Sequence, residues 1–229
     1  MLTATEIARR LKAGLNSKDN DPLSIVPFPP LEALKKTHNA SVDLRLGNWF
    51  LTMRENRVSE ISAAGPDEQW SESQLTKAHY VGFGDSFVIH PGGFALGVTL
   101  EWIRLPRTLG AYVVGKSGWG RAGLIIATAV GVHPRFNGCL TLELSNVGTV
   151  PVGLHPGVAI CQVFFHSVEG EQCEHAQESK FSGSRRPRLG KIQLDEIARK
   201  LMQRGPPALP LFNPDGTQSM LSAKGKRNR

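Results

Sequence analysis

The amino-acid sequence predicts a mainly β fold that begins with a short helix and is followed by a C-terminal extension. Its 229 residues include 24 Gly and 15 Pro, a composition typical of many short strands joined by tight turns. Hydrophobic residues make up 40% of the chain, which is enough for a core and excludes wholesale disorder. Several segments alternate apolar and polar residues with a period of two, as strands with one buried face do.

The first element is predicted to be a helix that begins near Thr3. Thr3 and Glu6 fit a capping box, in which the two side chains satisfy free backbone donors of the first turn. Gly14 is expected to end this helix. Residues 15–38 contain four prolines and are expected to form a loop.

Strands are predicted next, because the apolar period changes to two. Val42, Leu44 and Leu46 alternate with polar residues and indicate a half-buried strand. The mostly polar residues 55–79 are expected to form a long excursion. Further strands are expected close together, separated by Gly and Pro turns, at 87–90, 94–100, 110–114, 123–130, 139–145 and 158–166.

The extension differs from the body in charge. From Lys180 onward there are 12 basic and 3 acidic residues, a balance of +9, whereas residues 1–179 hold 15 basic and 17 acidic residues, a balance of −2. We therefore expect one β domain over residues 1–190. Residues 191–229 are expected to hold a short helix over 195–203 and a basic, disordered tail.

Three function classes are disfavoured by the composition. No apolar run approaches the roughly 18 residues of a membrane helix, and the N-terminus lacks the apolar segment of a signal peptide, so a cytoplasmic protein is expected. Cys139, Cys161 and Cys173 are odd in number and widely spaced, which argues against a disulfide framework. No C-x-x-C or H-x-E pair is present to suggest zinc. Cys139 and Cys161 are expected to be reduced and buried in strands.

A glycine-rich loop, residues 115–123, is a candidate for binding anions. It carries Lys116, Ser117 and Arg121, and the backbone amides of such loops can cradle anions. The same pattern is also that of an ordinary turn between strands. Residues 110–117 match the spacing of a P-loop, but the spacer is itself a predicted strand and the later glycines oppose a helix after Ser117, so a P-loop is not predicted.

Glu143 is the second candidate for chemistry. It lies at the centre of the predicted strand 139–145, on the face opposite Leu142 and Leu144. The carboxylate is therefore either a solvated group on the outer face or a functional group in a cleft. In a cleft it would suit general acid–base work.

The loop with Ser117 and Arg121, the strand with Glu143 and the spacing between them resemble the dCTP deaminase family within the dUTPase-like superfamily. The resemblance runs from Leu2 to about Lys180 and implies a dUTPase-like distorted β-barrel. It also implies a homotrimer whose active sites lie between subunits. The matching segments are residues 23–27, 40–47, 90–101, 105–106, 117–121, 128–129, 136–138, 142–146, 154–157 and 160–162.

The resemblance implies hydrolytic deamination of dCTP to dUTP and ammonia, without zinc and with Mg²⁺ accompanying the triphosphate. Glu143 would take a proton from the water that attacks C4 and pass it to the base or the departing amine. Ser117 and Arg121 would position the water and stabilise the transition state. The residues implied to bind the substrate are Lys116, Ala129, His133, Arg135, Gln162 and Lys180, the last on a C-terminal lid.

Four features depart from the family pattern. His133 stands where the family has an Asp that accepts from the sugar 3′-hydroxyl, and Arg135 replaces a turn glycine. Gly118 replaces a second Ser of the loop. In the lid, Ser184 replaces a Gln and is followed by the basic residues 185–188.

These departures leave alternatives open. One is pyrophosphate release from dCTP or dUTP, alone or coupled to deamination. Another is a nucleotide-binding relative with weakened catalysis. A third is nonspecific nucleic-acid binding through the basic tail.

Overall fold

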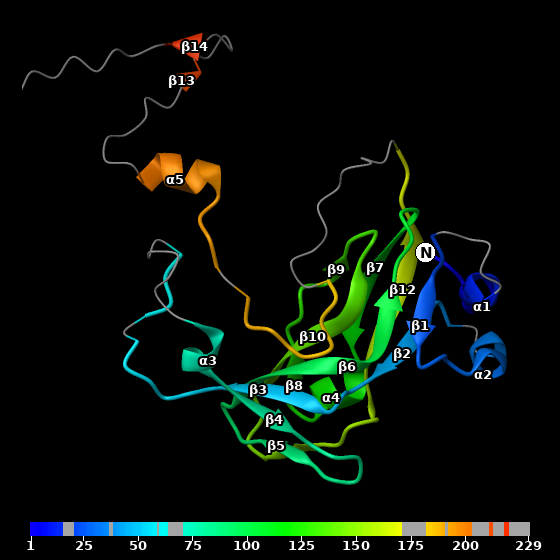
Figure 1. Cartoon of the computed structure of the whole chain (residues 1–229), viewed down its shortest axis with the longest axis horizontal. Helices are drawn as coiled ribbons and strands as arrows, with labels where there is room; N and C mark the ends of the chain where they lie inside the picture. The colour runs from blue at the N-terminus through cyan, green and yellow to red at the C-terminus, as the bar shows by residue number, and fades with distance from the viewer. Residues whose placement is uncertain are drawn as a thin grey trace, which may run out of the picture. The chain divides into compact units, whose positions relative to one another are not determined.

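The structure, a computed structural model, describes residues 1–15, 21–36, 39–58, 60–63, 71–170, 182–190, 192–202, 211–212 and 218–219 (Figure 1). The chain forms two compact units, and each is considered separately. The first unit comprises residues 1–57 and 70–190, and the second comprises residues 58–69 and 191–229.

The second unit holds little regular structure in its described part. It contains helix α5 (Glu196–Met202) and the pairing of β13 (Leu211–Phe212) with β14 (Gln218–Ser219). Helix α5 confirms the helix predicted over 195–203. The predicted boundary at residue 190 stays a prediction, and the end of the basic tail, residues 220–229, lies outside the described residues.

The first unit is mainly β, as predicted, and its named strands pair antiparallel. Across the described residues its strands form distorted sheets and no closed barrel. The six-stranded sheet has the order β4-β3-β6-β10-β8, with β1 also on β6: β1 (Ser24–Val26), β3 (Trp49–Met53), β4 (Thr76–Tyr80), β6 (Phe94–Arg104), β8 (Leu124–Ile126) and β10 (Asn137–Asn146). The four-stranded sheet has the order β2-β12-β7-β9: β2 (Ser41–Arg45), β7 (Leu109–Gly115), β9 (Gly131–Val132) and β12 (Ala159–Ser167). A two-stranded sheet joins β5 (Phe87–Ile89) to β11 (Val152–Leu154).

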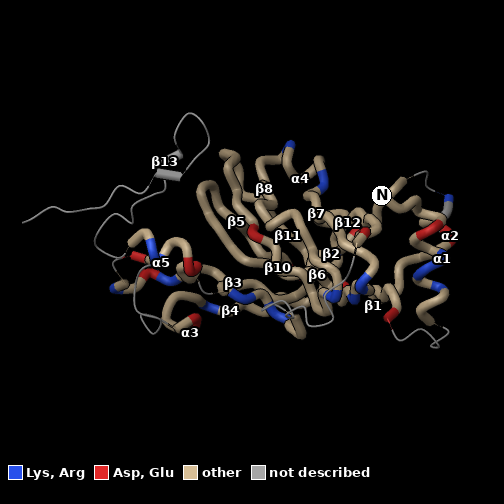
Figure 2. Tube along the Cα trace, turned by 90° about the horizontal axis from the view of Figure 1, so that it is seen from above, with Lys and Arg blue, Asp and Glu red and all other residues tan. Residues whose placement is uncertain are grey.

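One hydrophobic core joins these sheets to the N-terminal helix. Phe50 is completely buried and stacks on Phe87, with ring centroids 4.3 Å apart. In Figure 2 the labelled strands in the middle of the first unit are largely uncharged, as burial of their side chains requires. Other fully buried members of the core are Ile7, Leu11, Leu44, Leu46, Leu142, Leu144, Val163 and Phe165.

Helix α1 (Ala4–Leu15) confirms the predicted first element, but its predicted capping box is wrong in one half. The Glu6 backbone N–H donates to Thr3 Oγ1 at 3.3 Å, as expected. The Glu6 carboxylate instead accepts hydrogen bonds from Arg9 and Arg10 at 2.7 Å, and these hold its pKa at about 2. Two charged donors on the same helix outcompete a single backbone N–H.

Helix α1 also continues through Gly14, which was expected to end it. A Cβ at position 14 would lie 2.8 Å from the Leu23 carbonyl oxygen, so glycine here permits close approach of the following chain. None of the helices within the described ranges is long and apolar enough to cross a membrane.

Short elements were missed in the segments predicted to be loops. Residues 15–38 contain β1 and helix α2 (Leu31–Lys36), and residues 55–79 contain helix α3 (Glu72–Leu75) and β4. The pairing of β1 with β6 sets Ile25 opposite Ile103, so this strand depends on a distant partner. Three residues are too few to show an apolar period in the sequence.

The two cysteines predicted to be buried are indeed buried and free: Cys139 is 6% exposed and Cys161 is 0% exposed. Burial raises the pKa of Cys139 to about 11 and that of Cys161 to about 12. Cys173 lies outside the described residues.

We expect these two thiols to resist alkylation in the folded protein. At pH 8 only about one in a thousand Cys139 side chains would be the reactive thiolate, because its pKa lies about three units higher. In a Cys173→Ser background, iodoacetamide should label both cysteines rapidly in guanidinium chloride and slowly without it, as read by mass spectrometry. Equal rates in the two conditions would contradict the burial.

Candidate active site

A cavity of about 420 Å³ lies beside the central strand β10 and carries Glu143 on its wall. We call it the Glu143 cavity. Its wall also includes the start of β6, residues 128–129 and 131–136, and residues 188–189. Pockets of this size hold small organic ligands.

A β-bulge in β10 shapes this wall. The register with β6 shifts between Cys139 and Thr141, and the Leu140 backbone N–H donates to Thr99 Oγ1 at 2.9 Å. Beyond the bulge Glu143 lies opposite Leu96. The irregularity brings neighbouring side chains of β10 to one cavity, a common use of bulges beside functional sites.

Glu143 is held by its backbone while its carboxylate remains available. Its N–H donates to Thr128 Oγ1 at 3.2 Å, and its carbonyl accepts from Ala127 N–H at 2.9 Å. Its Oε2 is buried and accepts no hydrogen bond from any described residue. Because this oxygen is buried beside the cavity, Glu143 lies in a cleft rather than on a solvated outer face. A buried acceptor without a donor costs free energy.

The same contacts attach Ala127 and Thr128 to β10 just beyond the end of β8. The strand predicted over 123–130 ends at Ile126, and Thr128 and Ala129 line the cavity. Ala129 therefore lies on the cavity wall, and its contact with a substrate stays a prediction.

His133 and Arg135 lie in a turn on the cavity wall. The Phe136 N–H donates to the His133 carbonyl at 3.2 Å, which closes the turn, and Phe136 is buried. Arg135 has a φ of +68°, a left-handed conformation that favours glycine. The chain thus maintains a strained arginine at the cavity.

We expect Arg135→Gly to stabilise the protein, because glycine adopts this φ without steric cost. The gain should be about 1 kcal/mol, or about 2–4 °C in melting temperature. Thermal unfolding of Arg135→Ala provides the matched control, because alanine removes the charge but keeps the Cβ. Equal melting temperatures for the two variants would show that no strain is relieved.

The glycine-rich loop forms a short helix, which corrects the sequence interpretation. Helix α4 spans Ser117–Arg121, although its glycines were expected to prevent a helix. The Trp119 indole N–H donates to the Ala159 carbonyl at 2.9 Å, and its ring packs against the core. This anchor holds the single turn in place although each of its two glycines costs about 1 kcal/mol relative to alanine in a helix.

Four predicted residues gather at α4 rather than at the Glu143 cavity; we call them the α4 group. Lys116 Nζ lies 2.6 Å from Asp43 Oδ2 in an ion pair. Gln162 pairs in register with Asp43 across the sheet and accepts from the Ser41 hydroxyl at 3.4 Å. The members of the group are Lys116, Ser117, Arg121 and Gln162, and none of them lines the cavity.

Within the chain, the predicted site residues therefore fall into two separate groups. Glu143, Ala129, His133 and Arg135 line the cavity, and the α4 group lies elsewhere. Lys180 lies outside the described residues. The roles assigned to both groups stay predictions.

Nothing in the sequence singled out four residues that the structure places here. Arg188 and Leu189 line the Glu143 cavity, and Trp49 and Trp102 contact the segment that carries them. The basic run at 185–188 was visible in the sequence, but nothing in it distinguished one arginine from another. The tryptophans carried no sequence signal, because aromatic residues in strands usually only pack.

The described residues contain no group of three or more His, Cys, Asp or Glu side chains able to hold a metal ion. This finding concerns resident metals only. The zinc-free reaction and the Mg²⁺ that would arrive with a nucleotide stay predictions.

Known proteins are similar to this chain over most of its length. Residues 1–168 match the family model described as dCTP deaminase-like. The chain is 37% identical over 199 residues to a dCTP deaminase of Natronomonas pharaonis, which covers 85% of this chain and 96% of that protein. It is 34% identical over 200 residues to a "dCTP deaminase, dUMP-forming" of Methanothermobacter thermautotrophicus, covering 85% and 95%.

Among solved structures, the fold resembles that of 2′-deoxycytidine 5′-triphosphate deaminase from Agrobacterium tumefaciens. The TM-score is 0.51 at 22% identity. The match covers 72% of this chain and 45% of that one, so this chain spans less than half of that structure's length. This likeness supports the fold.

Proposed function

Because the chain belongs to the dCTP deaminase-like family, we propose that it is a hydrolase that converts dCTP and water to dUTP and ammonia. One observation carries the proposal beyond the family. The Glu143 carboxylate, with a buried Oε2 that lacks a described donor, faces a cavity within the family-matched part of the chain.

The proposed reaction uses this carboxylate twice. Glu143 takes a proton from water as the water oxygen bonds to C4 of cytosine. It then delivers the proton to the amine as the C4–N4 bond breaks and ammonia leaves, and the proton of the hydroxyl left on C4 passes to N3 to give uracil. The backbone of Ala129, on the same wall, would face the pyrimidine edge and orient C4 toward the carboxylate.

The separation of the two residue groups supports sites shared between chains. Ser117 and Arg121 are exposed on α4, where a neighbouring copy can reach them. In the proposed homotrimer, the α4 group of one chain would complete the Glu143 cavity of the next. Arg121 would then stabilise the developing charge, and Lys116 and Gln162 would face phosphates.

A second candidate function is favoured by the names of several relatives. Three are dCTP deaminases described as dUMP-forming, at 33–37% identity. Formation of dUMP from dCTP requires loss of pyrophosphate as well as the amino group. His133 stands where a carboxylate would be expected for pyrophosphate release, so deamination alone ranks first.

One assay separates these functions. The full chain is incubated with dCTP and Mg²⁺, and ammonia, pyrophosphate, dUTP and dUMP are measured together. Ammonia with dUTP supports the first candidate, and ammonia with dUMP and pyrophosphate supports the second. Saturable dCTP binding by calorimetry with no product would identify a relative with lost turnover.

A further inference from the structure

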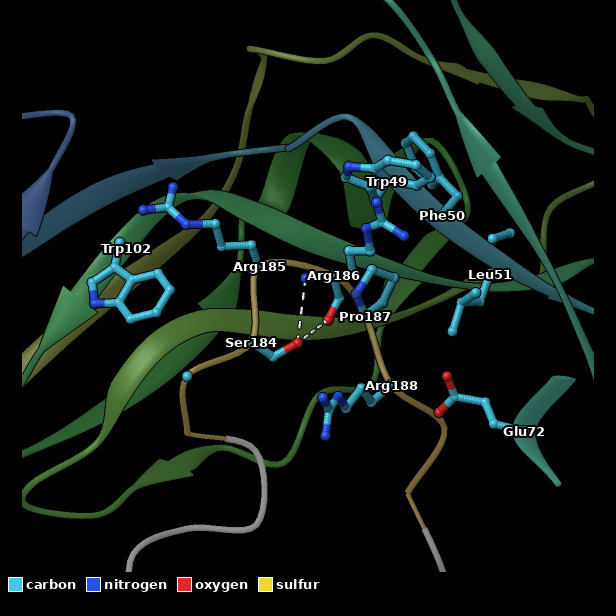
Figure 3. Close-up of a pocket in the computed structure, with 12 residues that line it drawn as sticks. Trp49, Phe50, Leu51, Glu72, Trp102, Ser184, Arg185, Arg186, Pro187 and Arg188 are labelled. Atoms are coloured by element: carbon cyan, nitrogen blue, oxygen red, sulfur yellow. Dashed lines mark hydrogen bonds between the residues drawn. The ribbon is translucent and has the colours of Figure 1, made fainter.

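An arginine-rich segment, residues 183–189, is attached to the start of β10; we call it the arginine segment. Gly183 N–H donates to the Asn137 carbonyl at 2.7 Å, and Cys139 N–H donates to the Ser184 carbonyl at 3.0 Å. Within the segment, the Ser184 hydroxyl donates to the Arg186 carbonyl at 2.6 Å (Figure 3). These bonds fix its backbone beside the bulge of β10.

Two tryptophans hold two of its arginines. The Arg185 guanidinium lies 4.9 Å from the Trp102 ring centroid, and that of Arg186 lies 3.9 Å from the Trp49 ring centroid (Figure 3). Both distances are within the range of a cation–π attraction. Pro187 between the arginines is buried, so the segment packs on the sheet as well.

Arg188 is directed differently from its neighbours. The adjacent Leu189 N–H donates to Glu72 Oε2 at 2.9 Å, while the Arg188 side chain points away from Glu72 (Figure 3). Arg188 lines the Glu143 cavity, and it forms no ion pair with a described residue. Of the three arginines, it is the one that lines the Glu143 cavity, and it also lines the neighbouring pocket beside Trp49 and Trp102.

We propose that Arg188 binds the phosphate groups of a nucleotide in the Glu143 cavity, and that Trp49 and Trp102 position it by holding Arg186 and Arg185. The proposal rests on the proposed function, which makes the ligand a nucleoside triphosphate. A guanidinium presents planar paired donors that match phosphate oxygens. A purely structural arginine would change stability and leave binding unchanged.

The first test measures binding without turnover. In a Glu143→Gln background, Arg188→Gln should weaken dCTP binding by about ten- to a hundredfold in calorimetry, the worth of a charge-assisted contact. Binding of deoxycytidine, which lacks phosphate, should not change. Arg199→Gln on α5, which lines neither the Glu143 cavity nor the pocket beside Trp49 and Trp102, is the matched control. Equal dCTP affinities for the Arg188 and Arg199 variants would overturn the proposal.

Inorganic tripolyphosphate separates this proposal from the proposed function. If the Glu143→Gln protein binds tripolyphosphate and Arg188→Gln loses that binding, the phosphate role stands even if the wild type releases no ammonia. If the wild type deaminates dCTP but Arg188→Gln binds both ligands normally, only the present inference falls. If neither ligand binds the parent protein, both proposals fall.

The second test addresses the tryptophans as positioning residues. Trp49→Leu should weaken dCTP binding severalfold, and Trp49→Phe should restore most of it, because phenylalanine keeps an aromatic face. In an Arg188→Gln background, Trp49→Leu should have no further effect, because its action passes through that arginine. Additive losses would show a merely structural role.

Discussion

Glu143→Gln protein is expected to release ammonia from dCTP about a thousandfold more slowly than the wild type. Glutamine keeps the shape and volume of the side chain but cannot take a proton from water. Loss of a general acid–base group typically costs about 10²- to 10⁴-fold in rate. The carboxylate lies on the cavity wall, and its buried Oε2 has no hydrogen-bond partner among the described residues. No described neighbour on that oxygen could therefore take over the proton transfer.

The control for this prediction is binding. Calorimetry should show that Glu143→Gln binds dCTP within a few fold of the wild type, because the change removes a proton acceptor and not the cavity. Glu169→Gln alters an exposed glutamate that does not line the cavity, and it should release ammonia at the wild-type rate. Ammonia release by Glu143→Gln within tenfold of the wild type would assign the proton transfer to another group.

Mixing two inactive variants is expected to restore activity. Arg121→Ala and Glu143→Gln should each be inactive alone, since each site of the proposed homotrimer would use Arg121 from one chain and Glu143 from the next. In randomly reassembled trimers of equal parts, about a quarter of the sites combine both intact residues. Ammonia release should therefore reach about a quarter of the wild-type rate.

A double variant serves as the control for mixing. Chains carrying both substitutions, mixed with Glu143→Gln chains, contain no intact Glu143 and should stay inactive. Native mass spectrometry of the same mixtures reports whether chains have exchanged. Exchange without recovered activity would place Arg121 and Glu143 in one chain's site. Wild-type activity of Arg121→Ala alone would instead remove Arg121 from the reaction.

The sequence predicted elements that carry a strong apolar period. The alternation around Val42 and Leu44 predicted β2, and that around Leu142 and Leu144 predicted β10 and the face on which Glu143 lies. Helix α4 was not predictable, because what stabilises it is the distant bond from Trp119 to Ala159. Glycine content alone gave the opposite expectation.

The candidate site was predictable only where a local sequence pattern identifies a residue. Glu143 could be recognised as an isolated carboxylate on an apolar strand, with two interpretations that only burial distinguishes. The place of Arg188 depends on the contacts of Arg185 and Arg186 with tryptophans from other strands. Those pairings join residues far apart along the chain, and no local pattern encodes them.

The ion pair between Lys116 and Asp43 has a consequence for how tightly a phosphate can be held at α4. With Nζ already 2.6 Å from Oδ2, a phosphate oxygen must replace the carboxylate before the ammonium can bind it. The gain is then the difference between two ion pairs that salt screens to a similar extent. Asp43 therefore competes with phosphate for the Lys116 ammonium. Lys116 should add little to the salt dependence of nucleotide affinity.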